Sequence, residues 1–349
     1  MALLEVDDVH VSFNTDDGVV HAVRGVSFEV ERGTTLGIVG ESGSGKSVCT
    51  QTITGLTRGA RVSGTARFDG LDLLTASDDQ LRAIRGEKIG MIFQDPLTSL
   101  HPAYSVGWQI IEMIRAHDRS VTKKQAKARA VELLGLVGIP YPADRVDDYP
   151  HQFSGGMRQR VMIAMAMALN PALLIADEPT TALDVTVQAQ VLQVMRNVQA
   201  EFGTAIILIT HDLGVIAEMA DEVVVMYAGQ VMERASRREL FYRHHHPYTE
   251  GLLASLPRHD GPAQRLTPII GTPPSLINPP VGCPFAPRCP YAFARCRQET
   301  PPLEPVYSTP EHTSACFLSS HEDERTQRRV ELQAQQSATN PASTVEGAA

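Results

Sequence analysis

Hydrophobic and polar residues alternate along much of the first 30 positions of the chain. Residues 3–13 and Val26–Val30 place apolar side chains at nearly every second position, which predicts two strands of an antiparallel sheet. Thr35–Val39, Leu173–Ala176 and Ala205–Ile209 are continuous apolar runs instead. Short runs of this kind are typical of strands that are buried on both faces of a parallel sheet.

Segments with helical spacing separate these strands. Residues 122–138 predict a helix, because Thr122 and Gln125 form a capping box at its start and Gly138 stands before Pro140 at its end. A second set of apolar side chains falls on one helix face that Gly203 ends: Val187, Val191, Met195, Val198 and Phe202. Strands that alternate with helices in this way predict a parallel α/β core.

The character of the sequence changes at Pro257, where prolines become frequent and regular periodicity fades. We therefore predict a first domain over residues 1–257 and a small C-terminal domain over residues 258–318. Residues 319–349 are rich in Glu, Gln, Ser, Thr and Ala, with scarcely any bulky apolar side chain. This composition is typical of a disordered tail.

Charge and hydropathy exclude several classes of protein. A net charge of −9 at pH 7 disfavours non-specific binding to nucleic acid, and we expect no nucleic-acid partner. No apolar run reaches the roughly 18 residues that a membrane-spanning helix requires. The first residues are acidic and alternating, unlike a signal peptide. We expect an intracellular, soluble protein that can still dock on a membrane protein.

A glycine-rich loop carries the first chemical signal. Residues 40–47 read Gly-Glu-Ser-Gly-Ser-Gly-Lys-Ser, between a predicted strand and a segment of helical spacing. This fits the P-loop pattern, in which backbone N–H groups and a helix N-terminus enclose phosphates. We expect Lys46 to reach the β- and γ-phosphates and the Ser47 hydroxyl to ligate Mg²⁺. The predicted phosphate-binding residues are Gly40, Glu41, Ser42, Gly43, Ser44, Gly45, Lys46, Ser47 and Val48.

Two carboxylates, Asp177 and Glu178, directly follow the buried strand Leu173–Ala176. Ligands bind outside the carboxyl ends of strands in open α/β sheets. Downstream of a P-loop, this pair predicts that Asp177 holds Mg²⁺ and that Glu178 orients and polarises the attacking water.

A third motif makes a family resemblance specific. Residues 153–160 read Phe-Ser-Gly-Gly-Met-Arg-Gln-Arg. This resembles the signature motif of ABC ATPases, commonly Leu-Ser-Gly-Gly-Gln, with Phe153 and Met157 as departures that are frequent in peptide importers. By this resemblance, the signature contacts the γ-phosphate of a nucleotide held by the opposite subunit. The residues assigned to that contact are Ser154, Gly155, Gly156 and Gln159.

The resemblance implies a P-loop ABC cassette with a RecA-like parallel-sheet core, an antiparallel β subdomain and a helical subdomain at about residues 95–165. It also implies that Gln94 contacts Mg²⁺ and the attacking water, that Asp184 belongs to the D-loop and that His211 bonds the γ-phosphate. Phe13 is similar in position to the aromatic residue that stacks on adenine. A phenylalanine of the hydrophobic core fits position 13 nearly as well.

Two further segments resemble the oligopeptide and dipeptide importers. Residues 93–102 read Phe-Gln-Asp-Pro-Leu-Thr-Ser-Leu-His-Pro, with His101 where Asn is usual, and residues 246–249 read His-Pro-Tyr-Thr. The resemblance implies an ATP-hydrolysing subunit at the cytoplasmic face of the inner membrane that powers peptide import. Its implied partners are a second, homologous cassette chain, two permease subunits and an extracytoplasmic peptide-binding protein. Nickel importers have a similar cassette and remain an alternative, and a soluble ABC ATPase is a more distant one.

Four of the five cysteines lie close together in the sequence, with the spacing C-x5-C-x6-C-x19-C: Cys283, Cys289, Cys296 and Cys316. In a reducing compartment, such clustering favours a metal site over disulfides. By resemblance to some peptide-importer subunits, a [4Fe–4S] cluster is favoured over Zn²⁺, and a metal-free arrangement remains open. We interpret Cys49 as a buried, unreactive thiol and His244–His246 as a solvated turn.

Overall fold

The computed structural model describes residues 2–95, 99–181, 183–256, 268–306 and 309–319, together with Gln327. The chain divides into two compact units, Met1–Val231 and Met232–Ala349. Their boundary falls inside strand β10 (Gln230–Ser236) and is therefore earlier than the boundary predicted near residue 258, a position outside the described residues. No helix in the described part of the chain is both long and apolar enough to cross a membrane.

A parallel sheet forms the centre of the first unit, in the order β9-β3-β8-β7-β6. Its strands are β3 (Thr35–Val39), β6 (Ile89–Ile92), β7 (Leu173–Asp177), β8 (Ala205–Thr210) and β9 (Glu222–Tyr227). Every residue of β3, β7 and β8 is buried, which explains their continuous apolar sequences. The predictions of these three strands are confirmed.

A smaller antiparallel sheet has the order β2-β1-β4-β5. Its strands are β1 (Leu4–Thr15), β2 (Gly18–Val30), β4 (Ala60–Phe68) and β5 (Leu71–Asp72). The predicted strand at residues 3–13 is confirmed, but β2 begins eight residues before the predicted Val26. Register shifts in the β1–β2 pairing interrupt the strict alternation of apolar and polar residues along this hairpin. The alternating pattern therefore predicts only part of β2.

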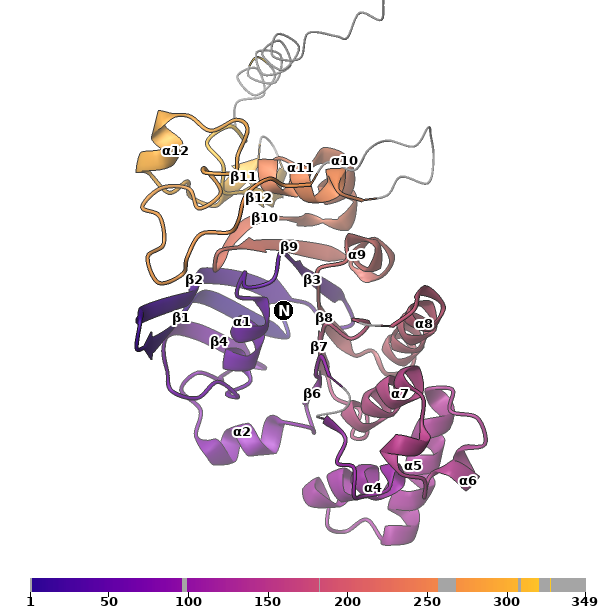
Figure 1. The fold of residues 1–349 in the computed structure, drawn as a ribbon. Helices are drawn as coiled ribbons and strands as arrows, with labels where there is room; N and C mark the ends of the chain where they lie inside the picture. Colours follow the sequence, from indigo (N-terminus) through magenta and orange to yellow (C-terminus); the bar gives the residue numbers. More distant parts are fainter. Residues whose placement is uncertain are drawn as a thin grey trace, which may run out of the picture. The chain divides into compact units, whose positions relative to one another are not determined.

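Helix α1 (Lys46–Ile53) belongs to the hydrophobic core that joins these two sheets. Figure 1 shows α1 on one side of the parallel sheet and α7, α8 and α9 on the other. Cys49 and Ile53 of α1 are fully buried. The prediction that Cys49 is buried is confirmed, and burial raises the pKa of its thiol to about 12, which agrees with an unreactive cysteine.

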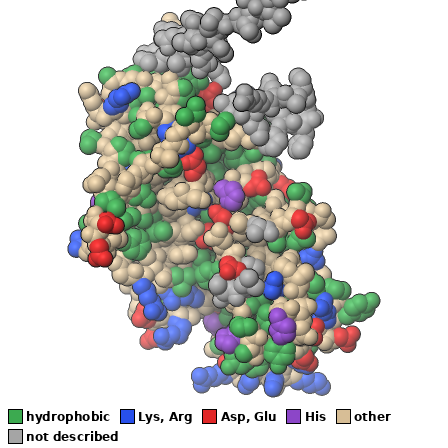
Figure 2. Space-filling view, viewed as in Figure 1, with side chains coloured by type: hydrophobic (Ala, Val, Ile, Leu, Met, Phe, Trp, Pro, Cys, Tyr) green, Lys and Arg blue, Asp and Glu red, His purple; other side chains and the backbone are tan. Residues whose placement is uncertain are grey.

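A group of helices forms one end of the first unit. They are α4 (Val106–His117), α5 (Lys123–Leu136), α6 (Pro142–Arg145), the 3₁₀ turn η1 (Pro150–Gln152) and α7 (Gly155–Ala166), within the predicted helical subdomain. Thr122 caps α5 and forms the predicted box with Gln125. Figure 2 shows Lys and Arg side chains at the lower end of the molecule, over α4 and α5. The other helices of this unit are α2 (Asp78–Ile84), α8 (Val185–Phe202) and α9 (Leu213–Met219).

The second unit contains a small antiparallel sheet in the order β11-β12-β10. Its other elements are α10 (Arg237–Arg243), α11 (Pro247–Ala254), α12 (Ala294–Gln298), β11 (Glu304–Val306) and β12 (Thr309–Ser314). Strands β10 and β12 pair across about 80 residues of sequence. This long-range pairing brings the segment from Met232 onwards into the second unit, which no local pattern could indicate.

A buried charge organises this second unit. Glu233 accepts a hydrogen bond of 2.8 Å from His312 and further bonds from the backbone N–H groups of His245 and His246. His246 is only 1% exposed, so the interpretation of His244–His246 as a solvated turn is wrong for this residue. Ser319, the first residue of the predicted tail, is also buried, while the remainder of that tail lies outside the described residues except for Gln327.

Candidate functional site

The glycine-rich loop joins β3 to α1, as its pattern predicts. Gly45 caps α1 with a φ of 95°, in the left-handed region that favours glycine. A Cβ atom on Gly45 would lie 2.4 Å from the carbonyl oxygen of Ala22, and one on Gly40 would lie 2.1 Å from that of Met226. Both positions therefore exclude larger residues. Ser42 and Gly43 are exposed at the top of the loop, and Ser44 is buried.

Lys46 points back into its own loop. Its ammonium group donates hydrogen bonds to the carbonyl oxygens of Gly40 (2.7 Å) and Glu41 (3.0 Å) and lies 3.4 Å from the Ser44 hydroxyl. Burial lowers the pKa of Lys46, although the nearby carboxylates of Glu178, Asp177 and Glu41 act in the opposite direction. A buried ammonium group held only by neutral oxygens is suited to exchange these partners for the oxygens of a phosphate.

Two of the predicted magnesium ligands, Ser47 and Asp177, meet at the base of the loop, whereas the third, Gln94, bonds Glu178. The Ser47 hydroxyl donates a hydrogen bond of 2.8 Å to Asp177, at the carboxyl end of β7. Burial raises the pKa of Asp177 and Glu178 contributes to the rise, while the Ser47 bond and Lys46 oppose it. A divalent cation would stabilise the charged carboxylate, so this hydroxyl and carboxylate fit the oxygen donors that Mg²⁺ prefers.

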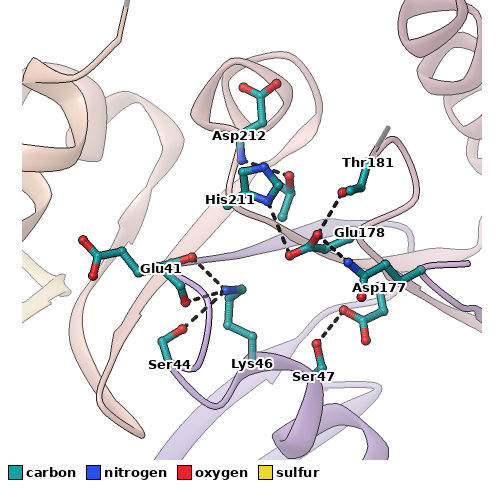
Figure 3. Close-up of polar contacts among 12 residues, drawn as sticks. Glu41, Ser44, Lys46, Ser47, Asp177, Glu178, Thr181, His211 and Asp212 are labelled. Carbon is teal, nitrogen blue, oxygen red and sulfur yellow. Dashed lines mark hydrogen bonds and ion pairs between the residues drawn. The ribbon is translucent and has the colours of Figure 1, made fainter. Parts of the chain in front are cut away.

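Glu178 stands at the centre of the site. One carboxylate oxygen accepts hydrogen bonds from Gln94 (3.1 Å) and from the Thr181 hydroxyl (2.8 Å). The other oxygen lies 3.4 Å from His211 Nδ1. Figure 3 shows Lys46, Ser47, Asp177, Glu178 and His211 directed toward one common region. The structure thus brings together the residues that the sequence predicts for a nucleotide-hydrolysing site.

The predicted signature residues lie elsewhere in the first unit. Ser154 caps α7 by accepting a hydrogen bond from the backbone N–H of Met157 at 3.3 Å. Gly155 and Gly156 form the first turn of this helix. Figure 1 shows α7 well separated from α1, so a phosphate bound to Lys46 does not lie against the signature turn of the same chain. Gln159 is buried, so its assignment to a nucleotide contact stays a prediction.

Three other predicted site residues have a structural role in the first unit. Asp184 caps α8 through a bond to the backbone N–H of Val187 at 3.0 Å. Phe13, on β1, packs partly buried against the hydrophobic core, as its alternative interpretation expected. Val48 also packs against this core. For these residues, a contact with nucleotide or with a second subunit stays a prediction.

Two polar contacts were not predicted from the sequence. Thr181 was recognised as the first residue of the segment that resembles the D-loop and ends at Asp184, but its bond to Glu178 was not expected. Arg85 donates hydrogen bonds of 2.7 Å to the carbonyl oxygens of Thr54 and Gly55, at the C-terminal end of the P-loop helix. The Arg85 contact joins residues about 30 positions apart, and no local motif marks it.

An apolar groove lies beside Gln94 in the first unit. Its volume is about 220 Å³. The groove runs between the end of α1, the β6 region and the helical part, and its lining includes Leu56, Phe93, Met113, Met162 and Met165. Phe93 immediately precedes Gln94 and is 39% exposed. An apolar ligand segment in this groove would therefore contact the neighbour of a predicted catalytic residue.

The four clustered cysteines line one small cavity of about 20 Å³ in the second unit, together with aromatic side chains that include Phe285 and Phe317. Burial raises the pKa of Cys283 to about 11, and the neighbouring thiols Cys316 and Cys296 add to the rise. Among the described residues, no group of three or more Cys, His, Asp or Glu side chains is positioned to hold a metal ion. The donor atoms fit a thiolate-bound metal, but their spacing here does not form a coordination site.

Comparisons with known proteins agree with this geometry. Residues 23–181 match the ABC transporter family, and residues 232–296 match the C-terminal region of oligopeptide/dipeptide transporters. The chain is 54% identical to the oligopeptide transport ATP-binding protein OppD of Bacillus subtilis, over 88% of this chain and 87% of that protein. It is 50% identical to the dipeptide transport ATP-binding protein DppD of the same organism, over 94% and 97%.

A solved structure gives the fold an independent match. The dimeric ATP-binding cassette MJ0796, in a post-hydrolysis state bound to ADP and Pi, is 27% identical to this chain. The superposition has a TM-score of 0.61 and covers 67% of this chain and 99% of that one.

Proposed function

Because the chain belongs to the ATP-binding proteins of the oligopeptide/dipeptide ABC transporters, we propose that it binds and hydrolyses ATP to power the import of short peptides. The observation that carries this proposal is the convergence of Lys46, the Ser47–Asp177 pair and the Glu178 carboxylate on one region at the carboxyl end of the parallel sheet. Bound Mg²⁺ would neutralise charge on the β- and γ-phosphates, with Ser47 and Asp177 holding it.

The residues of this chain then have separate roles. Lys46 exchanges its loop carbonyl partners for phosphate oxygens. Glu178 orients the attacking water in line with the γ-phosphorus and accepts its proton as the water oxygen bonds to phosphorus and the bond to the β–γ bridging oxygen breaks, which leaves ADP and phosphate. Gln94 and His211, which already contact Glu178, complete the polar surroundings of that water and of the γ-phosphate.

Hydrolysis needs a second cassette in this proposal. The signature turn begins at Ser154, where the N-terminus of α7 can bind an anion. This turn is remote from Lys46 of its own chain. The matching cassette MJ0796 is dimeric with ADP and Pi bound. Two cassettes placed head to tail would bring each signature to the other's nucleotide, and a homologous chain serves as the partner. Hydrolysis removes the shared contact and lets the pair reopen.

The groove beside Gln94 is the proposed docking site for a membrane permease subunit. Its apolar methionines and Phe93 can pack against a short helical segment, which links permease movement to the residue that contacts Glu178. We therefore propose a peripheral position at the cytoplasmic face of the inner membrane, with two permeases and an extracytoplasmic peptide-binding protein. A nickel importer is the alternative, and ATPase stimulation of the whole complex by peptides rather than by Ni²⁺ separates the two.

For the cysteine segment, we propose a [4Fe–4S] cluster, with Zn²⁺ as the alternative. Four thiols that line one cavity support a thiolate-bound group. A cavity of about 20 Å³ holds little more than a water molecule.

The experiment that tests the proposed function replaces the catalytic carboxylate. We expect Glu178→Gln to abolish turnover in the assembled transporter, to preserve ATP binding and to accumulate an ATP-bound cassette dimer, because the amide keeps the shape but cannot act as a base. Glu201→Gln, at an exposed position near the end of α8, is the matched control and should hydrolyse ATP normally. Near-normal hydrolysis by Glu178→Gln would refute the assigned role.

A further inference from the structure

The carboxylate of Glu178 is held by a neighbour within its own turn. The Thr181 hydroxyl donates a hydrogen bond of 2.8 Å to Glu178 Oε2, and the Thr181 backbone N–H donates to the Glu178 carbonyl oxygen at 3.2 Å. Figure 3 shows Thr181 on the far side of Glu178 from Lys46. The same short turn therefore fixes both the backbone and the side chain of the residue proposed to orient water.

This support matters because Glu178 has an unusual backbone conformation. Its φ of 48° lies in the left-handed region, which side chains other than glycine, Asn and Asp rarely adopt. Such a conformation persists only where surrounding contacts stabilise it. It also directs the side chain differently from the backbone conformation that is usual at the end of a strand. The bond between the Glu178 backbone N–H and the Ile209 carbonyl oxygen, at 2.8 Å, supplies one constraint. The two Thr181 bonds supply the others.

Two donors meet at Oε2, but they come from different parts of the chain. Gln94 follows β6 and is exposed, whereas Thr181 belongs to the turn of Glu178 itself. Gln94 is also proposed to contact Mg²⁺ and the attacking water, which would draw its amide away from Glu178. Thr181 lies three residues from Glu178 in the same turn and remains beside the carboxylate. With Oε2 held, Oε1, which lies 3.4 Å from His211 Nδ1, keeps a further lone pair to accept a hydrogen bond from water.

We propose that Thr181 is a positioning residue for ATP hydrolysis, whose hydroxyl holds Glu178 Oε2 so that Oε1 faces the attacking water. The inference rests on the proposed function and adds a group that acts through Glu178 rather than on the nucleotide. It assigns the hydroxyl, and not merely the size of the side chain, as the part that matters.

The test compares Thr181→Val with Thr181→Ser in the assembled transporter. Valine has nearly the shape of threonine without the donor, whereas serine keeps the donor. A hydrogen bond to a charged group contributes enough that its loss should lower kcat on the order of tenfold, with the KM for ATP unchanged. Thr181→Ser should restore most of the lost rate.

Other results would overturn the inference. Wild-type kcat in Thr181→Val, equal losses in the Val and Ser variants, or a raised KM with unchanged kcat would each assign Thr181 a structural or binding role instead. These results are distinct from failure of the proposed function. If the wild-type complex did not hydrolyse ATP, or if Glu178→Gln kept its activity, the function itself would fail whatever Thr181 does.

Discussion

The buried pair of Glu233 and His312 offers a quantitative test of how the second unit is stabilised. The two side chains are 0% and 2% exposed, and His312 Nε2 lies 2.8 Å from Glu233 Oε1. Replacing His312 with Leu removes this donor and leaves the carboxylate buried. Breaking a buried pair by removing one partner costs about 3–5 kcal/mol. We expect the lower part of that range, because the backbone N–H groups of His245 and His246 still bond Glu233.

Replacing the other partner should cost more. Glu233→Leu leaves His312 and both backbone N–H groups without their acceptor, and each buried unsatisfied group costs about 1–3 kcal/mol. The matched control is His10→Leu, since His10 lies 3.0 Å from Asp8 at a surface where the two side chains are 50% and 73% exposed. An exposed pair of this kind contributes below about 1 kcal/mol. The predicted order of destabilisation is Glu233→Leu, then His312→Leu, then His10→Leu.

The assay is urea unfolding of the full chain, combined with hydrogen exchange at the Ala315 amide. This amide donates to the Met232 carbonyl oxygen at 2.8 Å and so reports on the β10–β12 region. A loss of about 3 kcal/mol should accelerate its exchange by about a hundredfold. If His312→Leu changed the free energy of unfolding no more than His10→Leu does, the buried pair would not stabilise this unit.

The same pair should make stability depend on pH. Burial alone raises the pKa of Glu233, but the hydrogen bonds from His312 and the His245 backbone, with a contribution from His246, hold it below its usual value. A carboxylate with a lowered pKa in the folded state stabilises the protein above its unfolded pKa of about 4.5. This contribution is lost as pH falls through the lower folded value, so wild type and Glu233→Gln should converge in stability only in acid.

Two further predictions concern the phosphate loop and the cysteine segment. Gly45→Ala should weaken ATP binding at least about tenfold in a nucleotide titration, because its Cβ would lie 2.4 Å from a backbone oxygen. Gly59→Ala, at a similar φ with nothing within 4 Å of its Cβ, should bind ATP normally, and equal affinities in both variants would contradict the steric reasoning. Protein purified without oxygen should be brown and contain iron with acid-labile sulfide, whereas Cys289→Ser should contain less of both. A colourless, zinc-loaded wild-type preparation would exclude the iron–sulfur cluster.

The predictions that succeeded depend on information contained in short segments. Buried strands such as Thr35–Val39 are apolar at every position except Thr35 and the small Gly37, and the α5 capping box lies within four residues. The P-loop and the acidic pair are likewise local, so Lys46, Ser47 and Asp177 could be assigned before any contact was known. Their convergence then follows from the parallel sheet, which places the ends of neighbouring strands at one edge.

The features that were missed depend on contacts between distant segments. His246 was interpreted as solvated because its neighbours in the sequence are polar. Its backbone N–H instead donates a hydrogen bond to Glu233, which lies 13 residues earlier on a strand. The early boundary of the second unit follows from pairing between β10 and β12, which the proline-rich sequence between them conceals. Arg85 had no motif at all. Tertiary contacts of this kind override local pattern, and no reading of a short window can supply them.

The charges of the first unit indicate why nucleotide and metal should bind together. Burial lowers the pKa of Lys46 and raises that of Asp177, so burial disfavours the charged form of each group. A phosphate stabilises the ammonium form of Lys46 but adds negative charge near Asp177 and Glu178. A magnesium ion stabilises the carboxylate form of Asp177 but adds positive charge near Lys46. Only the two together balance both groups, and a site built in this way favours the Mg²⁺ complex of a nucleotide over either component alone.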